Sequence, residues 1–244
     1  MTLQLFDQPG ELASVLAADL LTRVQRRPSL VLGLATGRTP MGLYRELREL
    51  SARRLVNWAQ VRTFNLDEFV GHGEDGARYR ALMHDELFDH LNLQTEHIHL
   101  LEGRAADLGQ ECDRYERAII EAGGIDVQVL GLGVNGHIGF NEPSEALQSR
   151  THVALLERPT RERNAWLFGD DVSRVPHRAL SMGMATIFHA REVVLLATGM
   201  EKAEVVQAML EGPITPGLPA SFLQLHSNLR VMLGGAAAAG LSRR

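Results

Sequence analysis

Short apolar runs alternate with helical segments along the whole chain, and this alternation limits the possible folds more than any other sequence feature. Runs of about four to eight apolar residues predict buried strands. They lie at 3–6, 30–34, 61–64, 125–132, 151–156, 193–197 and 229–233. Apolar residues at helical spacing predict helices at 10–27, 40–50, 79–88, 105–122, 180–188, 205–210 and 220–225. We therefore expect an α/β protein with a single doubly wound, mostly parallel sheet and helices on both faces, a Rossmann-like three-layer arrangement.

Length and composition indicate one cytoplasmic domain. A chain of 244 residues with 45% hydrophobic content can bury its own core, so we expect a single domain over residues 1–244. Lysine and arginine total 25 against 30 acidic residues, and without a basic run this balance argues against nucleic-acid binding. Cys112 is the only cysteine, which excludes an internal disulfide and fits a reducing cytoplasm. We find no signal peptide and no apolar stretch near the roughly 18 residues that span a membrane.

The stretch 125–143, IDVQVLGLGVNGHIGFNEP, carries the strongest indication of a functional site. Its strand ends in glycines, and the polar residues Asn135, His137, Asn141 and Glu142 follow closely. In parallel α/β sheets, ligands bind beyond the carboxyl ends of the strands, where glycines let the backbone approach them. An imidazole near a carboxylate and an amide can move protons near neutral pH. The alternative is a glycine turn in which His137 is only a buried, hydrogen-bonded histidine, but the flanking Asn135 and Glu142 favour a site.

Two other segments are suited to an anionic ligand. Residues 35–40, ATGRTP, follow a buried strand and open a helix, with Thr39 as the expected N-cap and Pro40 at the first helical position. Backbone N–H groups and the helix dipole at such a turn attract phosphate, and an ordinary capped turn is the alternative. Lys202 lies near the start of a later helix, where a cation is unfavourable unless an anion binds beside it. A lysine that only faces solvent is the competing interpretation.

Two more segments contain charged residues that can contribute to a site. Asp67 and Glu68 follow the strand at 61–64, and they are either a helix cap with a solvated charge or a carboxylate that faces a ligand. Residues 157–176 combine four arginines with acidic residues and little apolar periodicity. This composition predicts a mobile surface segment that can act as a lid, with Trp166 and Phe168 as its apolar points.

Four of these segments resemble, in the same order, the motifs of the glucosamine-6-phosphate deaminase (isomerase) family. They are 34–40 (LATGRTP), 65–69 (NLDEF), 131–143 (GLGVNGHIGFNEP) and 199–202 (GMEK). The third motif is highly specific to the family. The Thr-Gly-x-Thr-Pro loop is shared more widely with related sugar-phosphate proteins, including 6-phosphogluconolactonases. The similarity extends from about residue 3 to residue 233.

The resemblance implies an enzyme of amino-sugar catabolism that works in the cytoplasm without a metal or other cofactor. Such an enzyme converts glucosamine 6-phosphate and water to fructose 6-phosphate and ammonia. The resemblance implies that His137 opens the sugar ring as acid and base, with Asn135 and Glu142 orienting and tuning it. It further implies that Asp67 removes the proton from C2 of the open-chain sugar and returns it at C1, after which the amine leaves by hydrolysis.

The resemblance also places the substrate phosphate. It implies that the turn formed by Thr36, Gly37, Arg38 and Thr39 binds the phosphate and that Lys202 lies opposite. The partner is then a small-molecule sugar phosphate, and we expect a monomer or a small homo-oligomer. The side-chain types fit this chemistry independently, because ring opening needs a group that gives and takes a proton near pH 7 and enolisation needs a separate ionised carboxylate.

Three positions depart from the family pattern. Many relatives have a small residue where this chain has Arg38, and an arginine in the lid about where this chain has Trp166. We hypothesise that Arg38 supplies the guanidinium that the lid usually brings, and the alternative is that Arg161 or Arg163 does so. Some members have aspartate where this chain has Asn135. The amide form resembles members without allosteric control, so we expect no activation by N-acetylglucosamine 6-phosphate.

Three other functions compete with this interpretation. A galactosamine-6-phosphate deaminase would differ in the recognition of one hydroxyl at C4, which the sequence does not decide. A 6-phosphogluconolactonase would use the same scaffold, although the Phe-Asn-Glu-Pro ending of the 131–143 motif and Asp67 argue against it. A non-enzymatic sugar-phosphate sensor is the third, and the intact set of Asp67, His137 and Glu142 argues against that.

Overall fold

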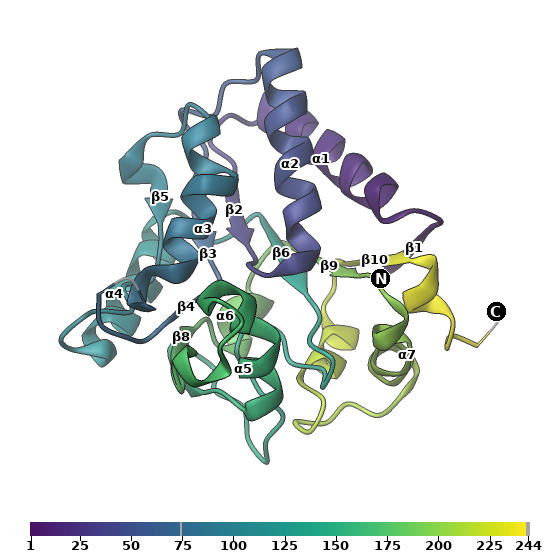
Figure 1. Ribbon diagram of the computed structural model, residues 1–244. Coiled ribbons are helices and arrows are strands. Elements are labelled where there is room, and N and C mark those ends of the chain that lie inside the picture. Colours follow the sequence, from purple (N-terminus) through teal and green to yellow (C-terminus); the bar gives the residue numbers. More distant parts are fainter. Residues whose placement is uncertain (74, 243–244) are drawn as a thin grey trace.

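The centre of the protein is a parallel sheet of seven strands, counted over residues 1–73 and 75–242, which the computed structural model describes (Figure 1). In spatial order the strands are β1 (Thr2–Phe6), β10 (Leu229–Gly234), β9 (Glu192–Ala197), β6 (Val127–Gly131), β2 (Val31–Leu34), β3 (Arg62–Asn65) and β5 (Ile98–His99). Every pair of neighbours runs parallel. Strand β9 is buried along its whole length, as expected for a sheet that is covered on both faces.

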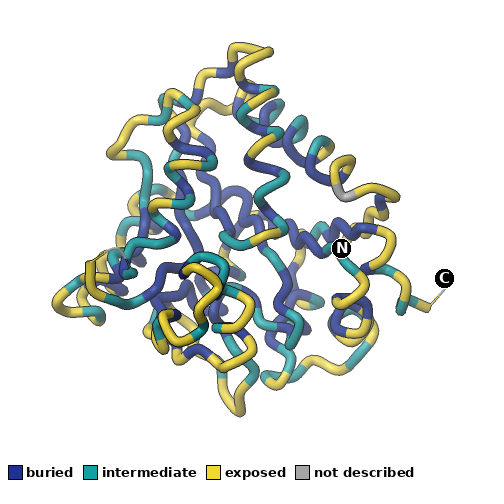
Figure 2. Tube along the Cα trace, viewed as in Figure 1, coloured by how far each residue is buried: buried dark blue, intermediate teal, exposed yellow. Residues whose placement is uncertain are grey.

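Helices cover both faces of this sheet. They are α1 (Pro9–Arg26), α2 (Arg38–Arg54), α3 (Arg78–Glu86), α4 (Leu108–Glu121), α6 (Met184–Phe188) and α7 (Ala203–Glu211), whereas the segment of the remaining helix, α5 (Arg158–Asn164), packs against a smaller sheet. Helices α1, α2 and α3 pack on one face, and α4, α6 and α7 pack on the other (Figure 1). The buried residues concentrate on the strands between these layers (Figure 2). The predicted doubly wound, three-layer fold is therefore confirmed.

The order of the strands reverses between β2 and β6. From β2 the chain continues outward to β3 and β5, then returns to the other side of β2 as β6 and continues to β9 and β10. Connections that leave two adjacent strands in opposite directions open a crevice at the carboxyl ends of those strands. The turn at 35–37 leaves β2 there and the loop at 132–137 leaves β6, so the fold brings two predicted site segments together.

A second, smaller sheet lies beside the first and was not expected from the sequence. It contains the antiparallel strands β4 (Asp67–Phe69), β8 (Arg178–Ser181) and β7 (His152–Leu155). The helix predicted for 180–188 is therefore wrong in its first part, where β8 pairs with both of its neighbours, and only α6 is helical. The residues of 180–188 are small and apolar, and such a run does not distinguish a buried strand from a helix without its pairing partners.

Helix α2 begins earlier than predicted. Its N-cap is Gly37, not Thr39, and its first residue is Arg38, so that Thr39 and Pro40 both lie within the first turn. Gly37 has a φ of 106°, a conformation that glycine adopts readily and that lets the chain turn directly from β2 into the helix. Pro40 is tolerated in the first turn because the N–H that it lacks has no partner there.

Candidate active site

A cavity of about 300 Å³ opens at the switch point between β2 and β6. Its walls come from the turn after β2, the end of β3, the loop after β6, helix α5 and the segment after β9. The predicted site residues that line it are Thr36, Gly37, Arg38, Thr39, Asp67, His137 and Lys202. The two remaining predicted residues, Asn135 and Glu142, do not line the cavity but contact His137. The structure thus gathers all the predicted side chains around one space.

Asp67 is a buried carboxylate that faces this cavity. It is 6% exposed, and its Oδ1 accepts a hydrogen bond of 2.8 Å from the hydroxyl of Thr36. The pKa of Asp67 is raised to about 7, because burial, together with the negative charge of Glu68, outweighs the opposing effect of the Thr36 hydrogen bond. A carboxylate with such a pKa is poised to exchange protons near neutral pH.

His137 lies on the other wall, and the glycines around it determine how it is held. The N–H of Gly133 donates to the carbonyl of His137 at 2.9 Å, which closes the loop after β6. The imidazole lies across Gly133, where a Cβ atom would come within 2.5 Å of three ring atoms. Gly136 has a φ of 84°, which the turn between these residues requires. The ring can occupy this position only because residue 133 has no side chain.

Glu142 and Asn135 form a polar support beside the imidazole. The Nδ2 group of Asn135 donates to Oε2 of Glu142 at 2.8 Å, and its Oδ1 accepts from the backbone N–H of His137 at 3.3 Å. Oε2 of Glu142 also lies 3.4 Å from Nδ1 of His137, an ion-pair distance. Burial raises the pKa of Glu142, but contacts with His137, Thr160 and Asn135 outweigh burial and leave the pKa below its ordinary value. Glu142 is therefore ionised and sets the orientation of the ring.

Lys202 lines the same cavity as the turn at 36–39. It ends the short helix η6 (Met200–Lys202), is 7% exposed, and donates from Nζ to the carbonyl of Leu132. The pKa of Lys202 is lowered to about 8, because burial, together with the positive charge of Arg163, outweighs the opposing effect of Glu201. A buried ammonium next to a guanidinium favours an anion in the space between them.

Two arginines also line the cavity. The guanidinium of Arg38 lies over the ring of Trp166, 5.8 Å from its centroid, and both residues line the cavity. Arg163 lines the cavity as well. Arg161 lies elsewhere, with Nη1 3.3 Å from the ring of His177. Of the two lid arginines considered as alternatives to Arg38, only Arg163 lies at the cavity.

The segment 157–176 is folded, although its sequence showed little apolar periodicity. It contains α5 and the short helices η4 (Ala165–Phe168) and η5 (Val172–Arg174). Phe168 is buried against Phe69, with 5.1 Å between ring centroids, in a cluster that also holds Phe140. Aromatic contacts of this kind fix α5 over the cavity.

Sequence reasoning missed three polar residues at the cavity. Tyr79 was interpreted only as an apolar position of a helix, but its buried hydroxyl donates to Oδ1 of Asn164 at 2.9 Å. Asn164 and Thr160 lie in α5, and both line the cavity. Their positions depend on packing between distant segments, and no local pattern in the sequence indicates it. Over residues 1–73 and 75–242 no group of metal-ligating side chains gathers, and no helix is long and apolar enough to cross a membrane.

Comparison with known proteins identifies the family. Residues 8–232 match the family model described as glucosamine-6-phosphate isomerases/6-phosphogluconolactonase. The chain belongs to this family. Among curated members, the chain is 45% identical to glucosamine-6-phosphate deaminase 2 of Bacillus subtilis, over 91% of this chain and 90% of that protein. It is 44% identical to glucosamine-6-phosphate deaminase of Shewanella woodyi, over 100% of this chain and 92% of that protein.

Solved structures of the family show the same fold. A structure described as a monomeric glucosamine-6-phosphate deaminase superimposes with a TM-score of 0.94 at 39% identity, covering 98% of this chain and all of that one. The 6-phosphogluconolactonase of Trypanosoma cruzi superimposes with a TM-score of 0.78 at 19% identity, covering 99% of this chain and 97% of that one. The latter likeness concerns the fold alone. The resemblance drawn from the sequence motifs is confirmed.

Proposed function

We propose that the protein is a glucosamine-6-phosphate deaminase, which converts glucosamine 6-phosphate and water to fructose 6-phosphate and ammonia. One observation carries this function: Asp67 and His137 line the same cavity from different strand ends, and the turn at 36–39 and Lys202 line that cavity too. An aldose–ketose conversion needs two separate proton-transfer groups at the reacting carbons. A phosphorylated substrate needs an anion site within reach of both.

His137 opens the sugar ring in this proposal. Opening a hemiacetal moves one proton from the anomeric hydroxyl to the ring oxygen, and an imidazole can accept the first and supply the second. Glu142 holds the imidazole at 3.4 Å and carries a negative charge that stabilises the ring when it is protonated. Asn135 bridges the two by accepting from the backbone of His137 and donating to Glu142. The imidazole of His137 thus exchanges a proton while Glu142 and Asn135 hold it in place.

Asp67 then moves the proton between carbons. Its carboxylate takes the proton from C2 of the open-chain aldehyde, which leaves an enolamine, and returns it to C1, which leaves an imine at C2. Water adds to the imine, and the C2–N bond breaks to give the ketone and ammonia. A buried carboxylate with a pKa of about 7 is a stronger base than an ordinary aspartate and is still largely ionised just above neutral pH.

The phosphate group is placed at the end of the cavity next to α2. The N-terminus of α2 and the hydroxyl of Thr39 supply donors on one side, whereas the hydroxyl of Thr36 donates to Asp67. Lys202 and Arg38 supply positive charge from two others, and Arg163 in α5 adds to it. A bound phosphate dianion removes the repulsion between Lys202 and Arg163 and restores an ordinary charge to Lys202.

The segment 157–176 acts as a lid in this proposal. It carries Arg163 and Trp166 at the cavity, and its Thr160 and Asn164 line the cavity as well. We further propose that the protein works in the cytoplasm, where its single thiol stays reduced, as a monomer or a small homo-oligomer. The single cysteine supports the location, and the solved structure described as a monomeric glucosamine-6-phosphate deaminase supports the small assembly.

The test is product detection with the purified chain. We expect ammonia and fructose 6-phosphate in equal amounts from glucosamine 6-phosphate, and a much lower rate from galactosamine 6-phosphate assayed in parallel. A preference for the galactosamine substrate would make the protein its epimer-specific counterpart. Hydrolysis of 6-phosphogluconolactone without ammonia release from either amino sugar would overturn the proposal. Binding of glucosamine 6-phosphate without turnover would identify a sensor instead.

A further inference from the structure

We propose that Glu68 is a positioning residue for this reaction: its buried carboxylate fixes the strand of Asp67 to the helix that brings Tyr79 to the cavity. The inference rests on the proposed deaminase function and adds a residue to it. Glu68 lies in β4 between Asp67 and Phe69, and neighbouring side chains of a strand point to opposite faces. Glu68 therefore points away from the cavity that Asp67 faces, and it does not line that cavity.

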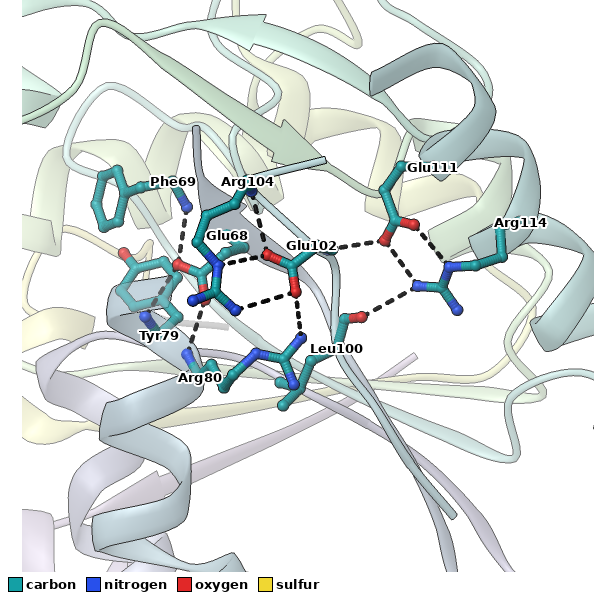
Figure 3. A network of polar contacts seen from close by, with 9 residues as sticks. All are labelled: Glu68, Phe69, Tyr79, Arg80, Leu100, Glu102, Arg104, Glu111 and Arg114. Carbon is teal, nitrogen blue, oxygen red and sulfur yellow. Dashed lines mark hydrogen bonds and ion pairs between the residues drawn. The ribbon is translucent and has the colours of Figure 1, made fainter. Parts of the chain in front are cut away.

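The carboxylate of Glu68 is bound entirely by backbone N–H groups (Figure 3). Glu68 is 1% exposed. Oε1 accepts from Phe69 at 2.9 Å and from Tyr79 at 3.0 Å, and Oε2 accepts from Arg80 at 2.8 Å. Tyr79 and Arg80 lie in the first turn of α3, whose N-cap residue Ala77 provides no side-chain cap. Glu68 thus caps α3 from eleven residues upstream.

The neighbouring arginines do not replace this role. The guanidinium of Arg80 reaches Glu102 at 3.5 Å, and Arg104 contacts Glu102 at 2.8 Å, so both turn toward the adjacent network (Figure 3). The three N–H donors approach both oxygens of Glu68, and only a carboxylate offers acceptors at both ends. An amide would present a donor to one of these N–H groups. The arrangement therefore selects a charged side chain at position 68.

The consequence for the site is that two cavity walls are fixed relative to each other. One wall carries Asp67, held by Thr36 at 2.8 Å, and the other carries Tyr79, whose hydroxyl holds Asn164 of α5 at 2.9 Å. Glu68 joins the two walls through its hydrogen bonds from the backbones of Tyr79 and Arg80, while its third hydrogen bond, from Phe69, lies within β4. Without the hydrogen bonds between Glu68 and α3, strand β4 can shift relative to α3, and the proton-transfer geometry at Asp67 changes with it.

The charge of Glu68 has a second measurable effect, on the pKa of Asp67. The pKa of Glu68 is raised to about 7, because burial outweighs the opposing effects of the three backbone donors and of the Arg80 charge; Arg104 also interacts with this carboxylate. The ionised carboxylate in turn raises the pKa of its neighbour Asp67. The other titratable groups that face Asp67 are tyrosines whose pKa values burial raises, namely Tyr44 from α2, Tyr79 from α3 and Tyr115 from α4. Among the described groups acting on Asp67, Glu68 is thus the acid whose removal is expected to lower that pKa.

The experiment compares Glu68→Gln with Glu116→Gln in the full chain, measuring kcat, KM and the pH dependence of kcat/KM for glucosamine 6-phosphate. Glu116 is a matched control because it is also a buried carboxylate with three donors, from Thr151 and Thr186, and lies outside the cavity lining. We expect Glu68→Gln to lower kcat roughly 10- to 100-fold, since displacements near 1 Å have such effects, and to change KM less than about twofold. The acidic limb of the kcat/KM profile of Glu68→Gln should move to lower pH, because Asp67 loses an adjacent negative charge.

The control variant should keep both the wild-type kcat and the wild-type acidic limb. Glu68→Asp retains the charge but is too short to reach all three donors, so it should lower kcat and leave the limb in place. This second variant carries the test if Glu68→Gln does not fold. If Glu68→Gln keeps both the wild-type kcat and the wild-type acidic limb of kcat/KM, the role of Glu68 alone is overturned. An unchanged kcat in Glu68→Asp has the same consequence. A wild-type protein that releases no ammonia would overturn the proposed function, and the role of Glu68 with it.

Discussion

Gly133→Ala tests whether His137 must lie where the structure places it. A Cβ atom built on Gly133 comes within 2.5 Å of Cγ, Nδ1 and Cε1 of His137. Ordinary van der Waals contact begins at about 3.4 Å, so the imidazole must move by about 0.9 Å. The backbone cannot absorb this displacement easily, because the N–H of Gly133 is itself bonded to the carbonyl of His137 at 2.9 Å.

A displacement of this size changes the chemistry more than it changes the fold. A misplacement of about 1 Å at a catalytic group costs on the order of 100-fold in rate, so we expect kcat to fall by that factor. Overpacking of a filled site costs roughly 1–3 kcal/mol of unfolding free energy, which a protein of this size survives. The turn at 36–39 and Lys202 are untouched, so KM should change by less than about threefold.

The assay measures kcat and KM from ammonia release, with thermal unfolding of each variant as a check on folding. Gly10→Ala is the matched control, because Gly10 lies in the first turn of α1 and a Cβ atom there meets nothing within 4 Å. The control should retain wild-type kcat. A folded Gly133→Ala variant with kcat within twofold of the control would refute the argument, since His137 would then tolerate a position that the structure does not give it.

Three further predictions follow from the charges at the cavity. The value of kcat/KM should fall as pH decreases through about 7, because Asp67 must be ionised to remove the C2 proton, and a flat profile between pH 6 and 8 would contradict that role. KM should rise as pH increases through about 8, because Lys202 loses its proton there and no longer attracts phosphate; Lys202→Met should abolish this dependence. Arg38→Gly should raise KM roughly tenfold or more, and an unchanged KM would assign the phosphate contact to Arg163 instead.

Most strands of the central sheet could be predicted from the sequence, because these strands are buried on both faces of the sheet. Such strands read as continuous or nearly continuous apolar runs, as β9 does from Val193 onward and as β6 does apart from Gln128, and such a run can be recognised without knowledge of its partners. Strand β8 was misassigned for the opposite reason. It pairs with β4, which lies more than 100 residues upstream, and that pairing outweighs the helical spacing of its small apolar residues.

The candidate site divides in the same way. His137, Glu142 and the turn at 36–39 were predictable because each follows a strand and sits in a compact motif whose residue types have a direct chemical use. Tyr79 and Thr160 were not, because neither lies in such a motif and each reaches the cavity only through tertiary packing. Glu68 illustrates the intermediate case. The sequence suggested a helix cap or a ligand group for the Asp-Glu pair, and the structure shows that Glu68 caps α3 while Asp67 faces the cavity.

The contacts of the lid segment bear on how substrate binding and chemistry are connected. Thr160 lowers the pKa of Glu142, Asn164 accepts the hydroxyl of Tyr79, and Trp166 lies under the guanidinium at the phosphate end of the cavity. These three lid residues lie within seven positions of one another, yet each contacts a different part of the site. Because α5 and η4 are joined end to end, the segment cannot move away from one of these parts without disturbing the others. If the segment moves when substrate binds, as its proposed role as a lid requires, the support of His137 must change with it.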